Sequence, residues 1–198
     1  MTIIRRYLPL LATSALLVIG YIICAFEFNG FTSFRVVGNL LTDNAFLGIT
    51  AVGMTFAIIS GGIDLSVGSV VAFTTVLVAT LIEWHGIHPL PAFALALAIG
   101  SAFGAMMGAI IHYLEMPPFI VTLGGMFLIR GVSFLITTES IGISHEFYAT
   151  VSDIAIRIGR GKLRLVAMLM MAMVTIGALL LHFTRFGSNV YAIGGSPS

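Results

Sequence analysis

Long apolar runs, separated by short polar segments, repeat along the whole chain. Most of them reach the roughly 20 apolar residues that a helix needs to cross a bilayer. The runs cover residues 8–26, 41–59, 67–82, 90–114, 119–137 and 165–183. This pattern predicts one all-α domain, residues 1–198, built as a polytopic transmembrane bundle of about six membrane-embedded helices in a lipid bilayer.

The segments between the runs suggest a topology. The first run follows Arg5 and Arg6 and has no small-residue cleavage site after it, which indicates an uncleaved span. Residues 138–164 are too polar to span and are expected to form an external loop or a surface helix. Six crossings would then return residues 184–198 to the side of the N-terminus. Basic residues in the external loop oppose the positive-inside tendency, so a re-entrant 67–82 run is the alternative.

A glycine-rich interruption that contains an aspartate lies between the second and third runs. Its sequence is Ser-Gly-Gly-Ile-Asp-Leu-Ser-Val-Gly-Ser, residues 60–69. Non-helical backbone at membrane depth must be covered by protein or line a wet cavity, because hydrocarbon offers it no hydrogen-bond partners. The break is therefore either a surface loop or one wall of a polar pathway. The pathway residues we predict are Gly61, Gly62, Asp64, Ser66 and Gly68.

Asp64 has a simpler role open to it as well. An aspartate just before a helix often accepts hydrogen bonds from the unpaired N–H groups of the first turn, where the helix dipole also favours a negative charge. Capping and a place in the pathway are compatible, and both are kept as predictions.

Arg130 stands near the centre of the fifth run. A charged side chain at that depth costs roughly 2.5 to 3.5 kcal/mol on insertion scales, so it needs a partner or water. One interpretation is an intramembrane charge that faces a polar pathway. The other is a buried pair, with Asp43 or Asp64 as the carboxylate, or a cap on the carbonyl groups of a broken helix.

Composition agrees with a membrane protein and argues against several functions. Hydrophobic residues make up 59% of the chain, charged residues 9%, and the mean hydropathy is +1.11, whereas a soluble domain carries roughly 25% charged residues. Nine Lys and Arg nearly balance eight Asp and Glu, which gives no reason to expect a nucleic-acid partner. Cys24 is the only cysteine, and the five histidines lack metal-ligand spacing, so no metal is predicted. No catalytic motif is present, so we predict no enzyme activity and no cofactor.

Small residues recur in the fourth run. Gly100, Gly104 and Gly108 are four residues apart and fall on one helix face, which lets a neighbouring backbone approach closely. We therefore predict a helix-packing contact there.

Three ordered blocks carry a resemblance to a known family. They are residues 51–56 (Ala-Val-Gly-Met-Thr-Phe) running into 60–69, residues 118–126 (Pro-Phe-Ile-Val-Thr-Leu-Gly-Gly-Met) with Arg130-Gly131, and residues 184–187 (Thr-Arg-Phe-Gly) followed by 191–195 (Tyr-Ala-Ile-Gly-Gly). In these blocks the chain resembles the permeases of bacterial ABC importers of the ribose and monosaccharide type. Residues 41–48 are most similar to the permeases of galactofuranose importers.

The resemblance implies a multi-pass inner-membrane permease that translocates a monosaccharide. It also implies a second permease as homo- or heterodimer, cytoplasmic ATP-binding-cassette ATPase subunits, and a periplasmic sugar-binding protein. Residues 184–198 resemble the start of the cytoplasmic segment that couples to the ATPase. The positions carried over to that segment are Arg185, Gly187, Gly194 and Gly195.

Family members are longer, so we expect this chain to be the N-terminal portion of a longer permease. Two alternatives come from other classes. One is a secondary transporter or channel subunit that uses Asp64 and Arg130, and the other is a membrane scaffold without transport activity.

Overall fold

The apolar runs fold into helices, and the polar segments between them form turns, short helices and one β-hairpin. A computed structural model describes residues 2–158 and 161–195. Its helices are α1 (Thr2–Glu27), α2 (Phe34–Asp43), α3 (Ala45–Ile59), α4 (Val67–Glu83), α5 (Pro89–Tyr113), α6 (Pro118–Ile136), α7 (Glu146–Asp153), α8 (Leu165–Phe183) and α9 (Arg185–Gly195). The predicted all-α polytopic fold is confirmed.

Four of the described helices, α1, α5, α6 and α8, are long and apolar enough to cross a membrane. Helices α2 and α3 are bent by 55° at Asn44 and would add a fifth, broken span. Helix α4 has 17 residues and rises about 26 Å, somewhat less than the roughly 30 Å of a hydrocarbon core. Residues before α4 must therefore lie within the membrane if this segment spans it.

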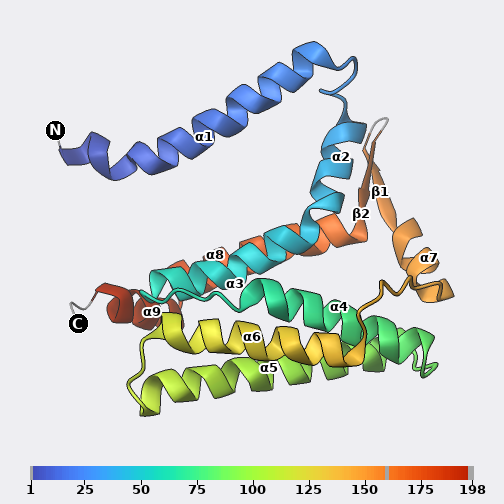
Figure 1. Ribbon diagram of the computed structural model, residues 1–198. Coiled ribbons are helices and arrows are strands. Elements are labelled where there is room, and N and C mark those ends of the chain that lie inside the picture. Colours follow the sequence, from blue (N-terminus) through green and yellow to red (C-terminus); the bar gives the residue numbers. More distant parts are fainter. Residues whose placement is uncertain (1, 159–160, 196–198) are drawn as a thin grey trace.

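The spanning helices pack in two groups (Figure 1). Helix α4 lies against both α5 and α6, and α3 runs beside α8. Buried Val78 and Ile82 of α4 contact Ala92 and Ala96 of α5 and form a small apolar core. Helix α1 stands apart from both groups, and its described apolar side chains are largely exposed. That exposure suits a helix whose solvent is lipid.

The predicted external loop 138–164 contains α7 and the hairpin. Strand β1 (Ala155–Ile158) pairs antiparallel with β2 (Gly161–Arg164), and Ala155 faces Arg164. Helix α2 lies on β2 at Gly38, where an added methyl group would sit 2.6 Å from the carbonyl oxygen of Lys162. We predicted no strand in this segment, and the hairpin is the one departure from an all-α chain among the described residues.

The residues before α7 attach to the turn between α4 and α5. The Glu83 carboxylate accepts a 2.6 Å hydrogen bond from the Ser144 amide, and the rings of His88 and His145 meet edge-on at 5.5 Å. Burial raises the pKa of the Tyr148 phenol, whose ring lies beside that of Phe93. These contacts hold α7 at the end of the molecule opposite α9 (Figure 1).

Candidate functional site

The glycine-aspartate break begins with a turn that only glycine adopts readily. Helix α3 ends at Ile59, and Gly61 has a φ of +82°, in the left-handed region. Residues 62–66 are non-helical and lead back into the molecule to the start of α4 (Figure 1). Residues 62–66 therefore lack helical hydrogen bonds, although they lie beside the apolar helices α5 and α6.

Asp64 forms a turn directly before α4. Its Oδ1 accepts hydrogen bonds from the Ser66 amide at 2.8 Å and from the Ser66 hydroxyl at 2.6 Å. Ser66 is the N-cap residue of α4 and is only 1% exposed. The carboxylate therefore closes an Asx turn on the N-cap residue and fixes how the chain enters α4, without accepting from the first helical turn in the described structure.

Thr122 of α6 contacts the break from the other side. Its hydroxyl oxygen lies 3.0 Å from the Ile63 carbonyl oxygen and 2.9 Å from the Pro118 carbonyl oxygen of its own helix, so the one hydroxyl proton is shared between them. Thr122 is 4% exposed. Gly62 lies near the ring of Pro118, which opens α6. Sequence reasoning did not single out Thr122, because nothing local shows that a residue 59 positions away supplies the partner.

Helix α9 packs directly on the break. A methyl group added at Gly194 would collide with the Ile59 carbonyl oxygen and lie 2.9 Å from its carbon and 3.1 Å from the Ser60 carbonyl carbon. The Gly194 Cα lies 3.6 Å from a methyl group built on Gly61. Gly187 is buried against the carbonyl groups that end α8. Arg185 and Gly195 are exposed, and the last three residues of the predicted 184–198 coupling segment lie outside the described residues.

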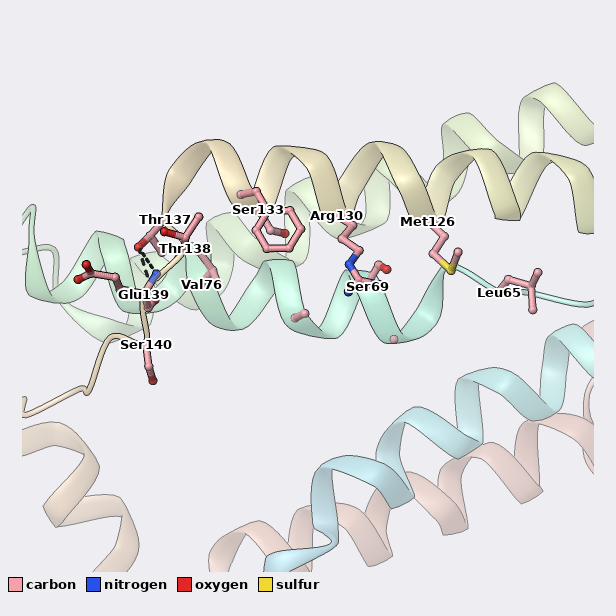
Figure 2. A pocket seen from close by; sticks show the side chains of 13 residues that line it. Leu65, Ser69, Val76, Met126, Arg130, Ser133, Thr137, Thr138, Glu139 and Ser140 are labelled. Carbon is pink, nitrogen blue, oxygen red and sulfur yellow. Dashed lines mark hydrogen bonds between the residues drawn. The ribbon is translucent and has the colours of Figure 1, made fainter.

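Arg130 lies in a groove between α4 and α6 that has a volume of about 540 Å³ (Figure 2). Its guanidinium carbon is 5.9 Å from the centre of the Phe134 ring. Neither Asp43 nor Asp64 pairs with it within the described residues. Gly68 also lines this groove, whereas Gly61, Gly62 and Asp64 line a different hollow of about 370 Å³ beside α5.

Metal chemistry finds no support in the part of the chain that the structure describes. No group of three or more His, Cys, Asp or Glu side chains is placed to hold a metal ion among those residues. The close pair His88 and His145 serves local structure, since each ring accepts a hydrogen bond from a backbone amide two residues later.

Comparison with known proteins decides the family. Residues 36–198 match the family described as branched-chain amino acid transport system, permease component. The chain belongs to this permease family. It is 56% identical over 196 residues to the inner membrane ABC transporter permease protein YjfF of Escherichia coli (strain K12). The aligned region covers 98% of this chain and 59% of that protein.

Two further relatives have names that state a substrate. The chain is 34% identical to the fructose import permease protein FruG of Bifidobacterium longum over 98% of this chain and 59% of that protein. It is 36% identical to the ribose import permease protein RbsC of Escherichia coli over 93% of this chain and 57% of that protein. The chain thus spans less than two thirds of the length of each of these relatives. No solved structure matches it.

Among the described residues, no neighbour approaches Gly100, Gly104 or Gly108 closely, so the helix-packing contact predicted there stays a prediction. Nothing described lies within 4 Å of a methyl group built at any of the three. They line the hollows beside the break instead, and Gly104 shares both hollows with Asp64. The close contact between α5 and α6 falls at Gly125, where Met107 fills the space that a side chain would take. The four-residue spacing places the three glycines on one face of α5, and a sequence pattern alone does not show whether another helix covers that face.

Proposed function

We propose that this chain is the membrane-spanning permease subunit of an ABC importer that carries a monosaccharide across the inner membrane. ATP hydrolysis takes place on separate cytoplasmic ATPase subunits, and a periplasmic binding protein delivers the sugar. A second permease, identical or related, completes the transmembrane unit. The names of FruG and RbsC support a sugar as the substrate.

One contact carries this proposal: α9 touches the break at Gly61 through Gly194. An ATP-driven permease needs a cytoplasmic element that transmits the movement of the ATPase to the polar interruption of its spans. Helix α9 follows the last described span, lies at the end opposite α7, and presents Arg185 to solvent. It is therefore placed to receive an ATPase on its outer side and to press on the break with its inner side.

The geometry gives less support to an ion-coupled secondary transporter. That mechanism would use Asp64 and Arg130 together, as a charged pair whose protonation or ion binding drives the cycle. The two residues line separate hollows, and the Asp64 carboxylate is engaged by Ser66. We therefore place ATP-driven import first.

Galactofuranose is the specific sugar that we propose, because residues 41–48 resemble those of galactofuranose importers. An uptake experiment tests both levels of the proposal. Cells that contain the full-length permease, its ATPase and its binding protein are given labelled galactofuranose, ribose, fructose or leucine. Uptake of at least one sugar, lost when ATP is depleted and kept when the ion gradients are collapsed, is expected. Uptake of leucine alone, or uptake that follows an ion gradient, would refute sugar import by ATP.

A further inference from the structure

The groove between α4 and α6 has an apolar lining in which a series of polar residues runs inward from one end. Thr137, Thr138, Glu139 and Ser140 lie at the end of α6 nearest α7, and Ser133 and Arg130 follow deeper along the same helix (Figure 2). Ser69 of α4 lies opposite Arg130, and the Arg130 guanidinium points toward Ser69. Ser133 and Thr137 form hydrogen bonds with backbone of their own segment. The Ser69 and Arg130 side chains have no hydrogen-bond partner among the described residues, so they are the groups free to bind a ligand in the groove.

Arg130 is an exposed cation without an acidic partner among the described residues. The Phe134 ring beneath it is 57% exposed. A guanidinium group has five N–H donors in a planar fork and accepts nothing, so its surroundings must provide several oxygen acceptors. Within the groove, water or a bound polyol can supply these acceptors.

The charges in the groove favour a neutral polyol over an amino acid. An α-amino acid has its ammonium and carboxylate groups on one carbon, so both charges need partners close together. Helix α6 ends at Ile136, about 9 Å along the helix axis from Arg130, and the acidic residue Glu139 follows beyond that end. Figure 2 shows the Glu139 carboxylate turned away from Arg130. A sugar needs no acidic partner beside the arginine.

We propose that this groove is a binding position for the translocated monosaccharide, with Arg130 donating hydrogen bonds to neighbouring sugar hydroxyls. The exposed Phe134 ring offers its negative face to the polarised C–H groups of the sugar. Ser69 adds a hydroxyl from α4. The volume of about 540 Å³ is within the usual range for small-molecule sites, roughly 300 to 1,000 Å³. This inference rests on the proposed function.

Kinetics of sugar uptake by the full-length transporter test the proposal. Arg130→Lys keeps the charge but loses the fork, and it should raise the KM for the transported sugar about ten-fold or more. Phe134→Leu should raise the KM several-fold with little change in the maximal rate. Phe127→Leu is the matched control, because Phe127 is a similarly exposed phenylalanine of α6 outside the groove lining, and its KM should stay unchanged.

A labelling experiment covers the case in which Arg130→Lys does not insert. With Cys24 replaced, Ser69→Cys places a thiol in the groove, and Ser101→Cys places one on exposed α5 as the control. Galactofuranose, ribose or fructose, whichever is transported, should slow the labelling of Ser69→Cys and leave that of Ser101→Cys unchanged. Sugar uptake with an unchanged KM in both groove variants, or no protection of Ser69→Cys, would overturn the binding position while leaving sugar import intact. Absence of any sugar uptake by the unaltered transporter would instead overturn the proposed function.

Discussion

Gly194 gives the sharpest test of how α9 acts on the break. Its Cα faces carbonyl groups of Ile59 and Ser60, so the new methyl group of Gly194→Ala would meet backbone that cannot rotate away. Overpacking of this kind costs about 1–3 kcal/mol, and the better helix propensity of alanine returns about 1 kcal/mol. A rigid backbone neighbour puts the clash at the upper end. The docked position of α9 should therefore lose about 1–2 kcal/mol, which is roughly a ten-fold shift toward the undocked position.

A helical glycine outside the coupling segment is the control for this experiment. A methyl group added at Gly20 of α1 meets nothing within 4 Å, so Gly20→Ala changes helix propensity without a clash. The assay is the number of sugar molecules taken up per ATP hydrolysed by the full-length transporter in proteoliposomes. Gly194→Ala should lower this ratio several-fold with normal membrane insertion, and Gly194→Trp should abolish coupling. Equal ratios for Gly194→Ala and Gly20→Ala would refute the idea that this contact transmits movement.

Three further predictions concern the break and the loop end. Asp64→Asn keeps an acceptor for the Ser66 amide and should reduce uptake less than Asp64→Ala, which loses a turn hydrogen bond worth about 1 kcal/mol; equal and total loss in both variants would show that the charge itself is needed. With Cys24 replaced, Ser144→Cys should react with an impermeant thiol reagent in intact spheroplasts, and reaction only after the membrane is opened would mean a miscounted crossing. Glu83→Ala removes the acceptor of the Ser144 amide and should speed hydrogen exchange there, whereas unchanged exchange would show that the bond does not hold the loop.

Hydropathy located most of the spanning helices because their ends are chemically abrupt. The run 165–183 coincides with α8, and the run 119–137 differs by one residue at each end from α6, which Pro118 opens. Proline fits the first position of a helix because its missing N–H would have no partner there. These boundaries depend on residues next to one another, which a sequence shows directly.

Features that depend on distant contacts could not be predicted in the same way. The sequence predicts one span over residues 41–59, whereas the helix breaks at Asn44 and α2 turns onto the hairpin through Gly38. Ala155–Ile158 has a single charged residue, Arg157, between Ile156 and Ile158, and so short a pattern does not predict a strand. The candidate site follows the same division. The Asp64 turn depends on residues next to one another, whereas the Thr122 and Gly194 contacts depend on the fold.

We propose that ATP, used at the α9 end, drives a monosaccharide inward past the break. Proteoliposomes with the complete transporter, the binding protein on one side and ATP on the other, measure this directly. We expect accumulation of a labelled sugar only when ATP is on the side that holds α9 and the binding protein is on the side that holds α7. Accumulation with both on the same side, or accumulation that an ion gradient drives without ATP, would contradict it.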